Sequence, residues 1–478
     1  MTRFLNGLSA MLLAVGVSST PALADAEDVS VAAQASSDAT LALVGGRLID
    51  GYGGTPVENA VVLIRGDRIV KIGRADQVDA SVATQILDFS GMTVLPGLWE
   101  SHGHLYHIGG GNPGEFQQKF APQTKEIMAA VAKASLLAGI TSFRDTGGPL
   151  EMQLELRDDI RTGRVPGPRL FLAGTILSQG EPDAGCSEPS CRDARVSSPK
   201  EAQRAVQRLV SRGADQIKVY GFWDQEILEA VTAAAHQAGV GVDADVRHRS
   251  AYVTAVKAGV DRLHHVFVAD PLSDYSDEDI RLLIGGWKPV GAGPSANIIR
   301  GPYIIPTVEV RQSYARVFNY PGLLDHHRLR NQYSPEVYEY LRSTWEQPRS
   351  VPWGMGAPER VEVVKTKLTR FVAAGGREQL VAGTDAGSPF NLHSPLTKEI
   401  RHLERAGLSS MEAIQAATLR PAQMQGVEQD LGTVSVGKLA DLIVVDGDPL
   451  QDLSLLEHRV VIVIKGGQPF FPDHNFPR

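Results

Sequence analysis

The stretch that decides the fold is Leu95-Pro96-Gly97-Leu98-Trp99-Glu100-Ser101-His102-Gly103-His104, an apolar run that ends in two histidines one residue apart. The apolar residues predict a buried strand. Side chains at positions i and i+2 of a strand point to the same face. His102 and His104 can therefore direct two imidazoles at one metal ion. A lone His-x-His is a weak signal, so the rest of the chain decides what it means.

From Val94 onward, short apolar runs alternate with longer helical stretches, several of them rich in alanine, such as 126–138 and 227–238. Eight strands that alternate with helices predict an α/β fold, a (β/α)8 barrel of the TIM type. The eight predicted strands are 93–99, 140–144, 169–173, 216–220, 241–245, 262–267, 303–307 and 379–384.

Both ends of the mature chain have strand patterns instead. Short apolar runs separated by Gly, Asp and Asn turns fill 40–94, and a similar pattern returns over 431–478. We predict one small β-sandwich domain built from these two parts, with the barrel over 95–430 between them. The long segments 273–300 and 312–349 are expected to insert at the mouth of the barrel, where such loops often cover a site.

The first residues are typical of a secretory signal peptide over 1–24. Arg3 supplies a short positive region, an apolar stretch too short to span a bilayer follows, and Ala22-Leu23-Ala24 fits a cleavage site. A polar, flexible leader is predicted over 25–39. A membrane anchor or a buried helix is the alternative for the first segment. The main prediction is export to a periplasm or the cell exterior, without a membrane association after cleavage near Ala24.

Charge and cysteine usage narrow the class of partner. The 478-residue chain has a net charge of −8 and no long basic run, which speaks against nucleic-acid binding.

Cys186 and Cys191 are the two cysteines, and in an oxidising compartment they are predicted to form a small local disulfide. A small-molecule substrate is the expected partner. A homo-oligomer is possible, although the sequence reveals no interface.

Polar residues recur where the predicted barrel strands end. The first strand ends at His102 and His104, the fourth at Lys218, the sixth at His265 and the eighth at Asp385. In barrels of this kind, catalytic groups lie at the carboxyl ends of the strands. We therefore expect these five side chains to meet in one site.

Several motifs together resemble the amidohydrolase superfamily of metal-dependent hydrolases, closest to its imidazolonepropionase-like and exported prolidase-like branch. The resemblance covers nearly the whole mature chain, and each motif alone is weak. The motifs are Leu95-Pro96-Gly97 with the His-x-His, 139–145, Lys218, 258–261 with His265, Gly383-Thr384-Asp385 and 437–442.

The resemblance implies a site with two divalent metal ions, zinc being the expected metal. His102 and His104 would bind the first ion, and His265 would bind the second. Lys218 would be carboxylated on its amine, because a carbamate can hold both ions whereas an ammonium has no lone pair. Asp385 would contact the first ion and act as the catalytic proton carrier for a metal-activated hydroxide.

One position departs from that pattern. The fifth strand should end in a histidine ligand of the second metal, but a gapless count back from Ala258-Gly259 places Asp245 there. Three interpretations remain open. Asp245 binds metal itself, as carboxylates can; His248 takes its place; or the second site is weak or lost, which would leave a one-metal hydrolase or an inactive relative.

Further residues near the strand ends are candidates for contacting the substrate. These substrate-binding candidates are Tyr220, His107, His248, Arg247 and His393. Arg144 and Arg247 suit a substrate carboxylate, with an internal ion pair as the alternative for each. A salt-bridged lysine is the alternative for Lys218. His264 is expected to pack against a barrel helix, because it is adjacent to His265 and faces the other side of its strand.

These observations favour an exported metal-dependent amidohydrolase that cleaves the C–N bond of a dipeptide or an N-acyl amino acid. A hydrolase of cyclic amides or lactones from the same superfamily is the first alternative. The second is a catalytically impaired barrel that binds a small molecule, as Asp245 in a ligand position would allow. Metal content distinguishes the second alternative from an active enzyme.

Overall fold

The computed structural model describes residues 40–472 except 181–194, 222–223, 269–274, 286–301, 323, 325, 349–356 and 394–395. All described residues belong to one compact unit, Gln34–Arg478. The predicted signal peptide and leader, and the predicted disulfide between Cys186 and Cys191, lie outside the described residues. Among the helices that are described, none has the length and hydrophobicity needed to cross a membrane.

Parallel strands form the centre of the larger part of the fold. One sheet has the order β6-β7-β8 and a second has the order β10-β9-β11-β12-β13-β14, and every pair in them is parallel. The strands are β6 (Leu98–Gly103), β7 (Ile140–Asp145), β8 (Arg169–Leu172), β9 (Leu177–Gln179), β10 (Arg195–Val196), β11 (Gln216–Tyr220), β12 (Gly241–Asp245), β13 (Arg262–His264) and β14 (Tyr303–Ile305).

The predicted eighth strand is present only as two isolated parallel bridges, Ile304 to Leu380 and Gly103 to Ala386. This segment therefore links β14, the last strand of the second sheet, to β6, the first strand of the first sheet. On the other side, the amide of Asp215 donates to the carbonyl of Leu172 at the end of β8 (2.8 Å). The result is a TIM-barrel-like α/β arrangement in which the predicted strand segments follow one another in chain order.

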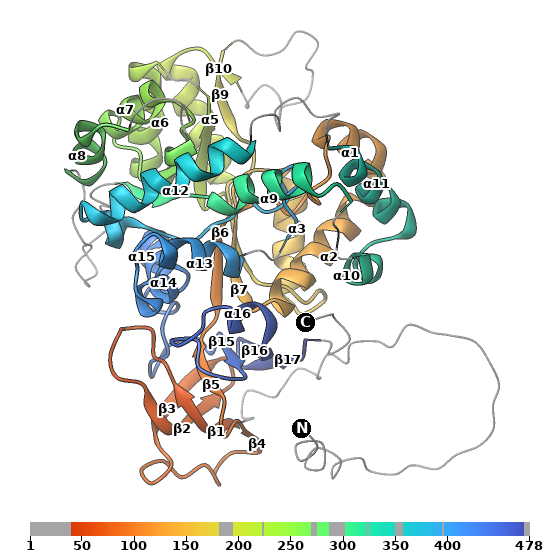
Figure 1. Ribbon diagram of the computed structural model, residues 1–478, viewed down its shortest axis with the longest axis vertical. Helices are drawn as coiled ribbons and strands as arrows, with labels where there is room; N and C mark the ends of the chain where they lie inside the picture. Colours follow the sequence, from red (N-terminus) through yellow and green to blue (C-terminus); the bar gives the residue numbers. More distant parts are fainter. Residues whose placement is uncertain are drawn as a thin grey trace, which may run out of the picture. The chain divides into compact units, whose positions relative to one another are not determined.

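Helices surround these strands (Figure 1). Their starts follow from the sequence: Ser198 caps α5 with Pro199 in its first turn, and the Asp224 carboxylate caps α6 by accepting from two backbone amides. The α-helices are α1 (Pro113–Phe120), α2 (Thr124–Leu137), α3 (Leu150–Arg161), α5 (Pro199–Ser211), α6 (Gln225–Gln237), α7 (Arg249–Lys257), α8 (Asp277–Gly285), α9 (Val308–Asn319), α10 (His326–Gln332), α11 (Pro335–Glu346), α12 (Ala357–Ala373), α13 (Leu396–Arg405), α14 (Ser410–Ala416), α15 (Leu419–Gln425) and α16 (Leu455–His458).

Much of the segment 312–349, predicted to insert at the barrel mouth, forms α10 and α11. The Trp345 indole on α11 donates to the carbonyl of Gly109 (2.9 Å), and the Tyr340 hydroxyl donates to the carbonyl of Asn112 (3.0 Å). Both acceptors lie in the loop that follows β6. Helix α11 therefore packs on the loop that leaves the His-x-His strand.

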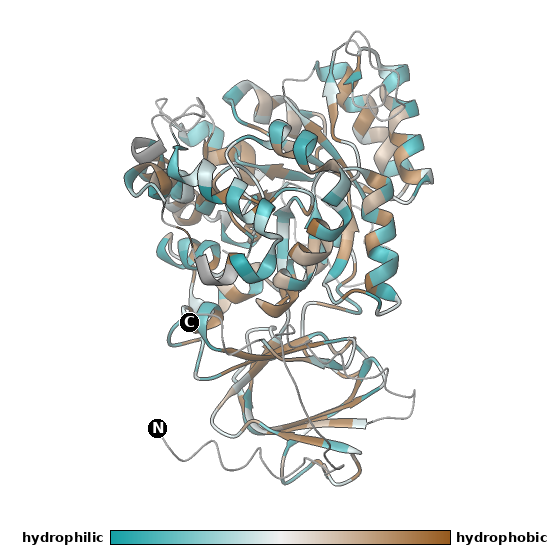
Figure 2. Ribbon diagram, turned by 90° about the vertical axis from the view of Figure 1, so that its right-hand side faces the viewer, coloured by the Kyte–Doolittle hydropathy of each residue, from teal (hydrophilic) through white to brown (hydrophobic). Residues whose placement is uncertain are grey.

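Strands from both ends of the chain form one eight-stranded sheet in the order β17-β16-β15-β5-β1-β2-β3, with β4 also paired to β1. In Figure 1 the orange β5 adjoins the blue β15, and Leu95 pairs with Ile443. Figure 2 shows that these strands are predominantly hydrophobic. The sandwich arrangement stays a prediction. The strands are β1 (Thr40–Leu48), β2 (Val57–Arg65), β3 (Arg68–Arg74), β4 (Gln85–Asp88), β5 (Thr93–Pro96), β15 (Leu442–Val445), β16 (Val460–Lys465) and β17 (Gln468–Phe470).

Gly97 lies where the chain passes from this sheet into the barrel, and no larger residue fits there. A Cβ at Gly97 would overlap the side chain of Thr141, which is buried and, being β-branched, cannot turn away easily. We expect Gly97→Ala to lower the free energy of unfolding by about 1–3 kcal/mol, measured by guanidinium denaturation. Gly54→Ala, where a Cβ meets no atom within 4 Å, is the matched control. Equal unfolding midpoints for the two variants would contradict this packing.

Candidate active site

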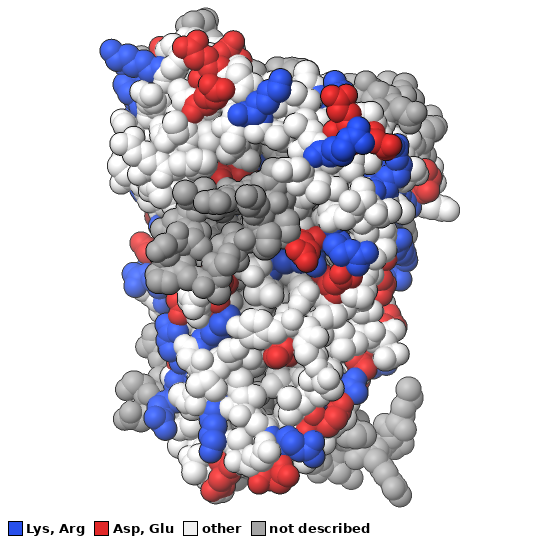
Figure 3. All heavy atoms as spheres, turned by 90° about the vertical axis from the view of Figure 1, so that its left-hand side faces the viewer, with Lys and Arg blue, Asp and Glu red and all other residues white. Residues whose placement is uncertain are grey.

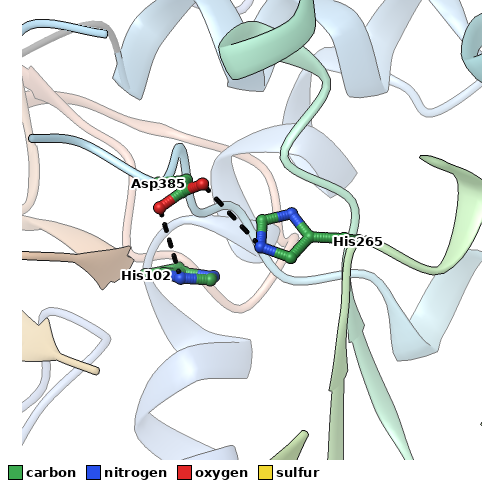
Figure 4. Close-up of side chains that lie close together, drawn as sticks. All are labelled: His102, His265 and Asp385. Carbon is green, nitrogen blue, oxygen red and sulfur yellow. Dashed lines mark ion pairs between the residues drawn. The ribbon is translucent and has the colours of Figure 1, made fainter. Parts of the chain in front are cut away.

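Three histidines and one aspartate converge at the carboxyl ends of the strands. Measured to the nearer carboxylate oxygen of Asp385, the distances are 3.5 Å from His102 Nε2, 3.4 Å from His104 Nε2 and 3.7 Å from His265 Nε2. Figure 4 shows His102 and His265 facing Asp385 from two sides. Because N–H···O hydrogen bonds are about 2.9 Å long, these contacts are too long to be good hydrogen bonds.

In each imidazole, the Nδ1 atom, which lies on the side of the ring away from Asp385, has its own hydrogen-bond partner. That partner determines which ring nitrogen of the neutral imidazole carries the proton. His104 Nδ1 donates to the carbonyl of Gly147 (3.1 Å). His265 Nδ1 lies 2.6 Å from the Thr307 hydroxyl oxygen, and that hydroxyl donates to the preceding backbone carbonyl (2.7 Å). The hydroxyl oxygen therefore accepts from His265 Nδ1. His265, whose pKa is lowered by burial, directs an unprotonated Nε2 at Asp385. Burial lowers the pKa of His104 too, but the long hydrogen bond and the charge of Asp385 outweigh it and raise the pKa, which favours a proton on His104 Nε2 when no cation is bound.

A series of hydrogen-bonded, buried side chains determines which nitrogen of His102 carries the proton. His264 Nε2 lies 2.7 Å from Asp243 Oδ1, and His264 Nδ1 lies 2.7 Å from His102 Nδ1. Burial lowers the pKa of His264 to about 3, so the ring is neutral. Since His264 Nε2 donates a hydrogen bond to the Asp243 carboxylate, His264 Nδ1 accepts a hydrogen bond from the Nδ1–H group of His102. His102 Nε2 is then also unprotonated, and it faces Asp385.

The centre of the site thus brings three imidazole Nε2 atoms and one carboxylate together. Burial tends to raise the pKa of Asp385, but the imidazoles of His104 and His265 outweigh it and hold the pKa at about 2. The carboxylate is therefore ionised, and a cation bound beside it would replace the proton on His104 and be held by the imidazole nitrogens and the carboxylate together. In a tetrahedral zinc site with bonds of about 2.1 Å, neighbouring ligand atoms lie about 3.4 Å apart. The distances of 3.5 and 3.4 Å from His102 and His104 to Asp385 fit this spacing.

A second group of candidate ligands adjoins the first. Lys218 Nζ lies 2.7 Å from Asp245 Oδ1, and His265 Nε2 lies 3.5 Å from the same oxygen. All three side chains are buried. Burial would raise the pKa of Asp245, yet the charge of Lys218 and the imidazole of His265 hold it well below its usual value. The structure therefore places Asp245 in the site, beside the lysine predicted to be carboxylated.

His248, the alternative ligand, lies elsewhere. It is exposed at the residue before α7 and belongs to neither group of potential ligand atoms found among the described residues. Those two groups are His102 with His265 and Asp385, and His102 with Asp245 and His264.

The backbone is strained where the site is built. His265, Thr307 and Asp385 have φ of +63°, +52° and +62°, in the left-handed region that non-glycine residues rarely adopt. Each follows a strand or bridge segment of the barrel. Strain of this kind persists where surrounding structure enforces it, and it concentrates at functional sites.

The strained turn at His265 explains why the sequence prediction for His264 is wrong. Alternation along a strand should place neighbouring residues on opposite faces. Strand β13 ends at His264, however, and the left-handed backbone at His265 breaks the alternation. Both imidazoles therefore reach the interior, where His264 contacts His102 and not a barrel helix.

Glu100 is a second residue that the sequence did not indicate. It accepts from the backbone amides of His102 (3.0 Å) and Thr384 (2.9 Å) and from the Thr384 hydroxyl (2.7 Å). Burial is the main cause that raises its pKa to about 7. Glu100 thereby ties the strand that carries His102 to the segment that carries Asp385.

The predicted substrate-contact residues take up different positions. Tyr220 is exposed at the end of β11, and the guanidinium of Arg247 lies 5.2 Å from the centre of its ring. His393 Nε2 donates to the carbonyl of His107 (2.7 Å), and the ring of His107 lies 6.0 Å from that of His104. These four residues border the ligand cluster.

Arg144 is no substrate ligand. Its guanidinium is fully buried and donates to both oxygens of Asp243 (3.0 and 2.9 Å), so the alternative of an internal ion pair is correct. Arg262 donates to the same carboxylate (3.2 Å). Asp243, Arg144 and Arg262 form a buried ionic layer that supports His264.

Comparison with known proteins adds independent information. The model of the amidohydrolase family matches residues 93–312 and 349–469. The chain is 24% identical to ochratoxinase from Aspergillus niger over 474 residues, covering 89% of this chain and 85% of that protein.

Solved structures are similar over almost the whole chain. A Xaa-Pro dipeptidase with bound methionine has 25% identity and a TM-score of 0.69, covering 91% of this chain and 100% of that one. A putative prolidase from Bifidobacterium longum has 25% identity and a TM-score of 0.67, covering 90% and 94%. The ochratoxinase structure from A. niger, at 21% identity and a TM-score of 0.67, covers 92% and 97% and shares the fold.

Proposed function

The chain belongs to the amidohydrolase family and is a hydrolase acting on C–N bonds, and from this premise we propose that it is an exported, metal-dependent enzyme. The substrate we propose is a dipeptide or an N-acyl amino acid. The observation that carries the metal dependence is the convergence of three imidazole nitrogens on the ionised Asp385. The dipeptide proposal is supported by the similarity to a Xaa-Pro dipeptidase and a putative prolidase.

The residues present fit two divalent ions, and zinc suits their nitrogen and oxygen donors. His102, His104 and Asp385 would hold the first, while His265 and Asp245 would hold the second. Bound divalent ions would lower the pKa of a bound water molecule and polarise the substrate carbonyl. Asp385 accepts the proton of the attacking water and delivers it to the leaving nitrogen, which breaks the C–N bond.

Lys218 is proposed to carry the carboxyl group that joins the two halves of the site. Its neutral amine attacks CO2, forming an N–C bond and releasing a proton, and the resulting carbamate offers two oxygens. The burial of Nζ beside Asp245 supports this role, because an anion at both positions would favour cation binding. Without the modification, the Lys218 ammonium instead neutralises Asp245.

Location and partners follow from the same proposal. The signal-like N-terminus supports export to a periplasm or the cell exterior. On the face drawn in Figure 3, basic and acidic side chains are interspersed, which supports a small-molecule substrate over a nucleic acid. Whether the enzyme is a homo-oligomer is open to measurement by light scattering.

Removal of metal is expected to abolish hydrolysis. After dialysis against a chelator, activity on a panel of dipeptides and N-acyl amino acids should fall at least about 100-fold and return when zinc is added. The measurement is the rate of amine release, with elemental analysis of the same samples. Full activity in metal-free protein would contradict the proposed metal dependence.

Two alternatives are distinguished by the same samples. Turnover of cyclic amides or lactones with no turnover of linear amides would identify a ring-opening hydrolase. Fewer than one bound ion per chain and no turnover at all would favour a binding protein. The aspartate in place of a histidine at 245 is the feature that favours this last alternative, and an increased metal content in Asp245→His would support it.

A further inference from the structure

Arg311 is a buried cation for which the described part of the chain supplies no counter-ion. Its side chain is 9% exposed, its Nε lacks a hydrogen-bond partner, and it forms no ion pair with any described residue. A buried charge without a partner costs considerable free energy, so proteins rarely keep one that has no function. Among the described residues, the position of Arg311 therefore leaves room for the anion of a bound ligand.

The helix that carries Arg311 directs it toward the candidate active site. Helix α9 starts at Val308, directly after Thr307, whose hydroxyl contacts His265. Residues four apart lie on the same side of a helix, and side chains lean toward the helix N-terminus. Arg311 lies in the first turn of α9 and therefore leans toward the N-terminal end of the helix, which Thr307 and His265 adjoin. The Tyr314 ring, 5.4 Å away on the same helix, packs against its guanidinium.

Arg247 approaches the same place from β12. Its Nη2 lies 3.8 Å from Asp245 Oδ2, and its Nε is buried without a hydrogen-bond partner. The pKa of Arg311 is lowered, first by burial and also by the charge of Arg247, while Asp385 acts in the opposite direction. The two guanidinium groups thus lie within electrostatic reach of each other and of Asp385. Both leave free the Nε edge that binds carboxylates in a fork.

The charges around this place do not balance. Arg247 and Arg311 are positive, Asp245 and Asp385 are negative, and Lys218 adds a third negative charge as the proposed carbamate, so two bound divalent ions leave positive charge in excess. A substrate that carries a negative charge next to the scissile bond would restore the balance.

We propose that Arg311 and Arg247 form a carboxylate-binding subsite, which restricts the enzyme to amides whose leaving amine carries a free carboxylate. This proposal rests on the proposed hydrolase function. Arg311 is the specificity-determining residue, because none of the described residues pairs with its charge. The substrate class is then N-acyl amino acids and dipeptides with an unblocked C-terminus, and neutral amides are excluded.

The test compares matched substrates in the zinc-loaded full-length mature enzyme. A panel of N-acetyl amino acids and Xaa-Pro dipeptides is prepared, each as the free acid and as the primary amide. Wild type is expected to hydrolyse the acids with a kcat/KM at least about 30-fold above that of the amides. Arg311→Gln should bring this ratio close to one by slowing only the acids. Arg281→Gln, an exposed arginine on α8, is the control and should keep the wild-type ratio.

Two further measurements keep the outcome decisive. Because Arg311→Gln removes a buried charge that no residue in the described part of the chain pairs with, its unfolding midpoint should equal or exceed that of wild type, which separates a specificity effect from misfolding. Calorimetric titration with the same acids separates the subsite from the hydrolase. Binding that depends on Arg311 without turnover would retain the subsite and overturn the hydrolase. Three results would overturn the subsite. They are an equal loss of kcat/KM on acids and amides in Arg311→Gln, a preference of the wild type for amides, and a failure of the acids to bind.

Discussion

Replacement of Asp385 by asparagine is expected to lower kcat/KM at least about 10³-fold. The carboxylate faces the Nε2 atoms of His102, His104 and His265, and its pKa of about 2 keeps it ionised at any pH at which the enzyme would work. Asparagine is nearly the same size but has no charge to hold a metal ion and cannot accept the proton of the attacking water. Both losses act on the same step.

The measurement for Asp385→Asn is the hydrolysis rate of the best substrate together with metal content. Asp446→Asn is the matched control, since Asp446 is an exposed carboxylate that pairs with Arg459 at the surface. The control should retain wild-type activity and metal. An Asp385→Asn variant that keeps more than a tenth of the activity would show that this carboxylate neither holds the metal nor moves the proton.

Asp243→Asn is expected to lower the free energy of unfolding by about 3–5 kcal/mol. Asp243 is fully buried and accepts hydrogen bonds from Arg144, Arg262 and His264. Burial alone would raise its pKa, but the two guanidinium charges hold the pKa far below its usual value, so the native group is a carboxylate. The neutral amide leaves both guanidinium groups buried without a counter-charge.

Guanidinium denaturation of Asp243→Asn beside Asp446→Asn measures this effect, and the surface variant should stay within about 0.5 kcal/mol of wild type. A second readout is metal affinity, which should fall about 10- to 100-fold in a folded Asp243→Asn sample, because His264 then no longer fixes the proton on His102 Nδ1. A variant as stable as wild type would mean that the buried ionic layer contributes nothing.

The sequence predicted the candidate metal ligands best where they stand at strand ends. His102, His104, Lys218, His265 and Asp385 were predicted from that position and from the family resemblance, and the structure brings all of them together. The carboxyl ends of parallel strands meet on one face of a barrel, so strand order alone brings these residues close. Their roles in catalysis stay predictions until they are measured.

Residues that depend on backbone detail were missed. His264 was misplaced because the left-handed turn at His265 is invisible in the sequence. Glu100 and Asp243 looked like parts of ordinary strands, since only their neighbours in space reveal that they are buried acceptors. Arg311 lies in a helix whose direction relative to the site cannot be derived from helical periodicity. The eighth strand was predicted as continuous but consists of two bridges.

The most direct test of the metal centre is anomalous diffraction at the zinc edge from crystals of the mature protein grown with zinc. The account predicts a peak at bonding distance, about 2.0–2.2 Å, from the Nε2 atoms of His102 and His104 and from an oxygen of Asp385. A second peak is expected beside His265 and Asp245. If zinc peaks at full occupancy appear elsewhere in the crystal but none appears among these side chains, the result contradicts the proposed metal centre.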